Sequence, residues 1–200
     1  MLAYFAILLA VLSRILPHAF HATAWNFTAV GGSLLFFGSR MGASKPGQSA
    51  RAFTWSTAAM LASALAILIA TDYYLTVYVY QYAFQTSAYL TTWIWYAAVC
   101  LLGMGILQKP SILRVAAGAL ATSTSFFLIS NFIVWAGGAV GSMYPRTAAG
   151  LAACYTAGIP FYRNDVVSTA ITAGALFGLP ALATKIVETM HAAHNDLPTA

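Results

Sequence analysis

Two charged side chains stand at the ends of long apolar stretches, and they are the first candidates for a chemical role. Arg14 closes the apolar run that begins at Leu2, and Asp72 directly follows the uncharged stretch 52–71. An ionised side chain in apolar surroundings is costly unless it is paired. Arg14 and Asp72 could therefore pair with each other for structure alone, or the pair could face a bound ligand.

One helical face carries a second candidate group. Ser123, Phe127, Asn131 and Trp135 follow one another at intervals of four residues, which places them on one side of a helix. The Asn131 amide could bridge two helices, or it could offer a donor and an acceptor to a bound small molecule. Trp135, on the same face, would then also be a candidate to contact this molecule.

Aromatic and polar residues also gather in the connections between the apolar stretches. Tyr74, Tyr78, Tyr80 and Tyr82 have a mostly alternating spacing, which indicates an extended segment presenting rings to one side. They could form an interfacial belt or a lid over a pocket. The remaining candidate ligand-binding residues are Asn26 at the start of the second expected helix and Tyr144, Arg146, Tyr155 and Asn164 in the connection 137–165.

Metal and nucleophilic chemistry have weak support. His18 and His21 lie three residues apart without an evident third ligand, and Cys154 has no nearby histidine to activate it. Cys100 lies in an apolar stretch, where packing is its expected role. No GxSxG, HExxH or P-loop pattern occurs, so the sequence predicts neither a metal site nor an enzyme.

Composition identifies the elements that must position these groups. Hydrophobic residues make up 60% of the 200 residues and charged residues only 6%, against about 25% charged in an average soluble domain. Stretches of about 20 uncharged residues are long enough to cross a bilayer as helices. The sequence predicts an all-α integral membrane protein, a single bundle over 1–190 with a short polar tail over 191–200. Its six expected helices are 2–16, 26–40, 52–71, 88–107, 112–136 and 166–189.

The first two segments are short, and they leave alternatives open. The first could be a signal peptide, although no basic residue precedes it and Arg14 interrupts it. The two together could form a re-entrant hairpin instead of two crossings, with no change in the sidedness of the rest.

Basic residues orient the bundle. Arg14, Arg146 and Arg163 fall on one side, and six basic residues fall on the other: Arg40, Lys45, Arg51, Lys109, Arg114 and Lys185. The positive-inside rule predicts both termini in the cytoplasm and the long connection 137–165 outside. The nine basic residues form no patch, so nucleic acid is not an expected partner. The expected partners are the lipid bilayer and a small-molecule substrate.

Several segments resemble an uncharacterised family of small bacterial membrane proteins regarded as transporters. The resemblance rests on Arg14-Ile15-Leu16-Pro17-His18, on Trp25 through Gly32, on Ser125 through Trp135, and on Tyr144-Pro145, Cys154-Tyr155 and Ile159-Pro160-Phe161. In size and helix count such proteins are similar to the substrate-binding (S) subunits of energy-coupling-factor (ECF) transporters. That likeness implies a bacterial inner-membrane location, a pocket near the outer surface and a transmembrane coupling subunit with ATPases.

The same likeness assigns a role to small residues of the first helix. Ala6 and Ala10 match an AxxxA pattern that contacts the coupling partner in S subunits, and Gly174 and Gly178 form a second small-xxx-small pair. Either pair could instead serve internal packing. No vitamin-specific signature is present, and Tyr80 stands where a cobalamin-type member would carry a cysteine. Cobalamin would then be a ligand only if Cys154 coordinated its cobalt.

These observations predict a substrate-binding membrane subunit that captures a small vitamin-like molecule at the outer face for uptake. The short first helices and abundant small residues leave a second hypothesis, an accessory structural subunit of a larger membrane complex. A third is a membrane enzyme acting on a lipid-like substrate at the outer face.

Overall fold

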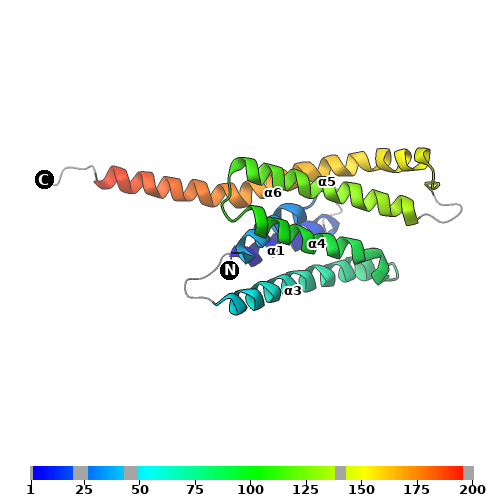
Figure 1. Ribbon diagram of the computed structural model, residues 1–200, viewed down its shortest axis with the longest axis horizontal. Helices are drawn as coiled ribbons and strands as arrows, with labels where there is room; N and C mark the ends of the chain where they lie inside the picture. Colours follow the sequence, from blue (N-terminus) through cyan, green and yellow to red (C-terminus); the bar gives the residue numbers. More distant parts are fainter. Residues whose placement is uncertain (1, 20–26, 43–48, 138–142, 196–200) are drawn as a thin grey trace.

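The computed structural model describes residues 2–19, 27–42, 49–137 and 143–195, and its regular elements are all helices. They follow the expected order along the chain (Figure 1). Their bounds are α1 Leu2–Ala19, α2 Val30–Met41, α3 Ala50–Tyr74, the π-helix η1 Leu75–Val79, α4 Thr86–Ile106, α5 Ile112–Gly137 and α6 Ala148–Asn195. The predicted all-α class is therefore confirmed.

Four helices are long and apolar enough to cross a membrane: Thr54–Val79, Thr86–Ile106, Ile112–Gly137 and Ala148–His191. The apolar part of α1, Leu2–Pro17, is shorter. The 12 residues of α2 rise only ~18 Å, which is less than a ~30 Å hydrocarbon core. By length, α2 cannot cross a bilayer by itself, so the expectation of six full crossings does not hold for this helix.

The two ends of the bundle differ in their side chains. At one end, where α2 and α4 end and α3 and α5 begin, lie Arg40, Lys109 and Arg114, and we name it the basic end. At the other, where α3 and α5 end and α4 and α6 begin, lie Tyr74 and Tyr78, and we name it the aromatic end. The chain begins and ends on the side of the basic end (Figure 1).

Helix α2 is the centre of the fold. Every residue from Val30 to Ser39 is buried, and the helix packs against α1, α4 and α6. Its glycines make this possible, because a Cβ added at Gly32 would lie 2.7 Å from the backbone nitrogen of Ala173 in α6. A Cβ at Gly38 would overlap the carbonyl oxygen of Cys100 in α4. A helix that is buried on all sides has no polar face, which explains its run of small and apolar residues.

The predicted connection 137–165 is wrong over most of its length. Helix α6 begins at Ala148 and continues through Pro160 and Pro180 to Asn195, so it also absorbs half of the predicted polar tail. Proline removes one backbone hydrogen bond, but neighbouring groups can compensate for this loss in apolar helices. Asn164 and Asp165 therefore lie on a helix inside the bundle and not in an outer loop.

The predicted extended segment after Asp72 is also wrong. Helix α3 runs to Tyr74 and continues as the π-helix η1, and only the short stretch around Gln81 leaves the helical path, with φ of 58° at Gln81. The rings of this region stack against the start of α4: Phe84 lies 5.1 Å from Tyr89 between ring centroids. Tyr74 and Tyr78 lie in this helical segment with their ring centroids 5.8 Å apart, so their spacing is helical and not strand-like.

Two glycines of α4 provide a test of the close packing around α2. A Cβ at Gly103 would overlap the carbonyl oxygen of Leu35, whereas a Cβ at Gly105 would meet nothing within 4 Å. We expect Gly103→Ala to lower the free energy of unfolding by about 1–3 kcal/mol, because backbone must move to accept the methyl group. Gly105→Ala should raise it by up to about 1 kcal/mol through helix propensity. Unfolding in detergent measures both, and equal stability of the two variants would contradict the packing.

Candidate ligand-binding site

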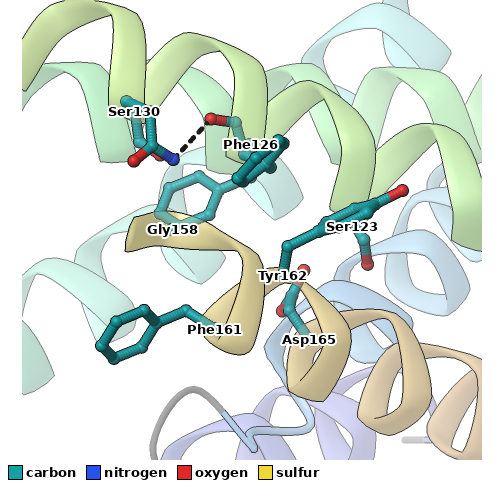
Figure 2. A pocket seen from close by; sticks show the side chains of 9 residues that line it. Ser123, Phe126, Ser130, Gly158, Phe161, Tyr162 and Asp165 are labelled. Atoms are coloured by element: carbon teal, nitrogen blue, oxygen red, sulfur yellow. Dashed lines mark hydrogen bonds between the residues drawn. The ribbon is translucent and has the colours of Figure 1, made fainter. Parts of the chain in front are cut away.

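A cavity of about 160 Å³ lies between α5 and α6 (Figure 2). It extends toward the aromatic end from the level of Ser123 and Asp165 to that of Asn131 and Gly158. Helix α5 supplies one wall and α6 the other, and these two helices make the most extensive contact of the fold. The lining residues are Ser123, Phe126, Phe127, Ser130, Asn131, Gly158, Phe161, Tyr162 and Asp165.

Gly158 keeps this cavity open. A Cβ at this position would lie 2.7 Å from Oδ1 of Asn131 and 2.9 Å from the ring of Phe127. The absence of a side chain on α6 thus leaves room for the amide of α5. The Asn131 Nδ2 group donates to the carbonyl of Phe127 at 2.8 Å within its own helix, and its Oδ1 atom accepts from the Cys154 thiol of α6 at 3.8 Å. The amide thus bridges the two helices, which is one of its two predicted alternatives.

The inner part of the cavity is polar and incompletely satisfied. Asp165 is 9% exposed, and neither its Oδ2 atom nor the Ser123 hydroxyl has a hydrogen-bond partner. In Figure 2 both side chains point into the space between α5 and α6. Most buried polar groups in proteins are hydrogen-bonded, so these two atoms call for an explanation.

The polar character continues from this cavity toward α2. The buried hydroxyls of Thr122, Thr169 and Ser33 also lack a hydrogen-bond partner. Thr122 and Thr169 both lie against Gly31 at the start of α2, where an added Cβ would be 2.6 Å from the Thr169 hydroxyl. Thr169 is one helical turn beyond Asp165 on the same side of α6.

Aromatic rings form the rest of the wall. Phe127 stacks on Tyr162 with ring centroids 4.7 Å apart, and Phe126 packs on Trp95 of α4 at the same separation. The Tyr162 hydroxyl lies 2.9 Å from that of Thr124, which satisfies it. The rings are thus held in place by contacts outside the cavity.

Three residues expected at a ligand instead join α5 to α6. Tyr155 donates to the carbonyl of Leu128 at 2.8 Å, and Trp135 donates to the carbonyl of Pro145 at 3.1 Å. The Cys154 thiol is buried and contacts the carbonyl of Asn131 at 3.3 Å. These bonds close the aromatic end of the helix pair and fix the position of Asn131.

Arg14 and Asp72 form an ion pair of 2.5 Å between α1 and α3, as the first of the two alternatives predicted. The second carboxylate oxygen of Asp72 accepts a hydrogen bond of 2.8 Å from the indole of Trp93 in α4. Asp72 is 1% exposed, and neither it nor Arg14 lines the cavity between α5 and α6. The pair therefore ties three helices together. The residues expected in one pocket fall into two separate places, the Arg14–Asp72 pair and the cavity between α5 and α6.

The other expected site residues are dispersed. Tyr74 is exposed and lies 5.8 Å from the ring of Tyr78, and Arg146 is exposed before the start of α6. Tyr144 and Asn164 are half-buried and do not line the cavity. Asn26 and the side chain of His18 lie outside the described part of the structure.

Ala6 and Ala10 are fully buried inside the chain, and both belong to the first helix, which packs on α2. Of their two alternatives the structure shows internal packing, so these residues present no surface to a partner helix. Gly174 and Gly178 differ, because a Cβ on either would meet nothing within 4 Å. Both line an apolar groove of about 520 Å³ between the basic-end halves of α5 and α6.

The sequence interpretation missed six of the nine lining residues: Phe126, Ser130, Gly158, Phe161, Tyr162 and Asp165. Asp165 was assigned to the connection 137–165 because the uncharged stretch that defined the last helix begins at Val166. The spacing of Gly158, Tyr162 and Asp165 at intervals of four and three residues was the available signal for one helical face. In the described residues, no group of three or more His, Cys, Asp or Glu side chains could hold a metal ion.

The ion pair provides a second prediction. Arg14→Leu should lower the free energy of unfolding by about 3–5 kcal/mol, because it leaves the buried Asp72 carboxylate without its cation. Adding Asp72→Asn should restore more than half of this loss, since the asparagine oxygen can still accept the Trp93 bond. Unfolding of both variants in detergent measures the difference. An Arg14→Leu protein as stable as the wild type would rule out the structural role.

Comparison with known proteins gives one finding. A family model described as "Family of unknown function (DUF6580)" matches residues 1–192. Among curated proteins and among solved structures, none matches the chain. The likeness to ECF S subunits therefore stays a prediction. Because the match covers almost all of its 200 residues, the chain belongs to the DUF6580 family.

Proposed function

We propose that this protein is a membrane-embedded binding protein that captures a compact small molecule at its aromatic end for uptake. The observation that carries the proposal is the cavity between α5 and α6, with Ser123 and Asp165 at one end and Asn131 nearer the aromatic end. Sites for small molecules are concave, and polar groups in them fix the orientation of the ligand. This cavity combines four aromatic residues with four polar side chains, so it suits a small polar molecule.

Polar groups inside apolar helices support the same proposal. Both walls belong to helices that are long and apolar enough to cross a membrane. Ionisable residues within such segments are rare and commonly mark substrate or ion pathways. A ligand that bonded to Asp165 and Ser123 would account for their unpartnered atoms.

The size of the cavity narrows the class of ligand. Sites for drug-sized ligands usually have volumes of about 300–1000 Å³, whereas this cavity has about 160 Å³. The vitamin-like ligand expected from the sequence would therefore be a compact one, and a corrinoid such as cobalamin would need a much larger opening.

Orientation follows from the basic side chains. Arg40, Lys109 and Arg114 at the basic end favour placing that end in the cytoplasm, with both termini, and the aromatic end outside. The cavity would then lie toward the outer side of a bacterial cytoplasmic membrane, behind the bonds that Tyr155, Trp135 and Cys154 make. In this proposal α1 and the short α2 enter as a hairpin, which leaves the sidedness of α3 to α6 unchanged.

A second candidate function, a subunit of a larger membrane complex, is favoured by the groove that Gly174 and Gly178 line. Small residues on an open helix face let a partner helix approach closely. The proposed uptake also needs an energy source, and a transmembrane coupling subunit with ATPases could contact this groove. Both functions therefore assign the groove to a partner, and only the first assigns the cavity to a ligand.

Substitutions at two glycines of α6 distinguish the two candidate functions. Gly158→Leu should fill the cavity and abolish binding, whereas Gly174→Leu projects from an open site and should leave binding intact. The measurement is the melting temperature of purified protein against a panel of compact vitamins and amines, where saturation at 100 Kd adds about 2.7 kcal/mol of stability. We expect at least one compound to raise the melting temperature of the wild type and of Gly174→Leu only.

The opposite pattern would favour the second function. If no compound stabilises the wild type, and a stoichiometric assembly isolated from native membranes is lost in Gly174→Leu but kept in Gly158→Leu, the capture function is wrong. A compound that stabilises Gly158→Leu as strongly as the wild type would place the ligand elsewhere.

The proposed sidedness has its own test. Of the three lysines, Lys109 and Lys185 lie away from the aromatic end, and Lys45 falls outside the described residues, between α2 and α3 in the sequence. An amine-reactive reagent that does not cross membranes should therefore label inside-out vesicles and leave intact spheroplasts unlabelled. Arg146→Lys places an amine at the exposed aromatic end and should make spheroplasts reactive. Labelling of the wild type from outside would reverse the orientation.

A further inference from the structure

We propose that the captured ligand is a small organic cation whose ammonium group binds the carboxylate of Asp165. This inference rests on the proposed function, because it names the class of molecule that the cavity between α5 and α6 would bind. It is carried by one buried carboxylate without a cation and by the aromatic rings around it.

Asp165 is an acid in a place that calls for a positive partner. Its side chain is more than nine-tenths buried, it lines the cavity, and its Oδ2 atom has no hydrogen-bond partner. An ionised carboxylate at such a site is costly unless it is paired. The position is well inside the apolar segment Ala148–His191.

No cation of the chain fills this role among the described residues. Arg14 is already paired with Asp72, and that pair lies among α1, α3 and α4, away from Asp165. Arg163 is only two residues from Asp165, but two residues correspond to about 200° around a helix. Its side chain is exposed, whereas that of Asp165 is buried.

The comparison with Asp72 shows what a buried carboxylate of this fold requires. Asp72 is 1% exposed, and its two oxygens are bound by the Arg14 guanidinium and the Trp93 indole. The fold thus provides full compensation for one intramembrane carboxylate and not for the other. A ligand that brings its own positive charge would give Asp165 what Arg14 gives Asp72.

The rings around the cavity suit the same ligand. Phe126, Phe127 and Tyr162 line it, and the ring of Phe161 points away from Asp165 (Figure 2). Ring faces attract ammonium groups, by about 0.5–2 kcal/mol for each favourable contact. No Lys or Arg lines the cavity, so nothing in its wall would compensate an anionic ligand.

The uncharged polar residues of the cavity indicate which groups the ligand would carry besides its ammonium group. The Ser123 hydroxyl and the Asn131 amide can donate and accept, so a hydroxyl or carbonyl next to the ammonium group would fit them. A volume of about 160 Å³ corresponds to roughly five water molecules, so the ligand is a compact amine.

The test compares choline with its uncharged carbon analogue, in which a quaternary carbon replaces the nitrogen. Both are added to the purified full-length protein at constant ionic strength, and affinity is taken from the melting temperature. Choline should raise the melting temperature and the analogue should not. Asp165→Asn, which keeps the shape of the side chain, should weaken choline binding roughly 30-fold or more.

Two further variants keep the result interpretable. Glu188→Gln removes an exposed acid from the same helix and should bind choline like the wild type. Without ligand, Asp165→Asn should melt at or above the wild-type temperature, because it removes a buried charge that lacks a partner. Retained melting cooperativity in Asp165→Asn shows that a loss of binding is not a loss of fold.

Each remaining outcome overturns the inference. Equal stabilisation by choline and its carbon analogue, or choline binding that persists in Asp165→Asn, would show that charge is not recognised there. Stabilisation by sodium ions alone, with no added effect of choline, would assign Asp165 to an inorganic cation. If neutral compounds bind the wild type but not Gly158→Leu, and choline does not bind, the cation is wrong while the proposed capture function stands.

Discussion

The close approach of α2 to α4 and α6 is the constraint on which the rest of the structure depends. Backbone meets backbone at Gly32 and Gly38 on α2 and at Gly103 on α4, and a methyl group at any of these sites would force the helices apart. A helix of 12 residues can therefore occupy the interior, although it is too short to cross a bilayer alone. Small residues at helix contacts are the usual means of packing where lipid is as apolar as the side chains.

From this arrangement follow two polar regions with different roles. On one side of α2, the Arg14–Asp72 pair and the Trp93 indole join α1, α3 and α4 through bonds that satisfy the Asp72 carboxylate. On the other side, α5 and α6 are joined near the aromatic end by Tyr155, Trp135 and Cys154. From Gly158 toward Asp165 the cavity lies between the two helices. In the first region both carboxylate oxygens of the acid are bound, although Nη1 of Arg14 has no partner, whereas in the second region the Asp165 carboxylate has no cation beside it. This difference separates a structural tie from a candidate binding site.

Sequence reasoning predicted the helical class, most helix positions and the Arg14–Asp72 pair, because apolar length and the cost of isolated charge are local properties. It failed where tertiary packing decides. The last helix was expected to begin at residue 166, yet α6 begins at Ala148 and continues through Pro160, so Asp165 lies in the bundle and not in a loop. Ala6 and Gly174 carry the same small-residue pattern, and only the structure distinguishes the buried pair on α1 from the open pair on α6.

The incompletely bonded residues also explain why the cavity is better regarded as functional than as a packing fault. Natural sequences agree with their fold at most positions, and violations concentrate at sites that have another role. Replacing Asp165 by an apolar residue would remove a buried oxygen that has no partner, and this single substitution should stabilise the resting protein. Gly158 differs, because a side chain there would lie 2.7 Å from the Asn131 amide and 2.9 Å from the Phe127 ring. A chain that keeps the acid between α5 and α6 retains it at the expense of stability, and a bound cation is the partner that would offset that loss.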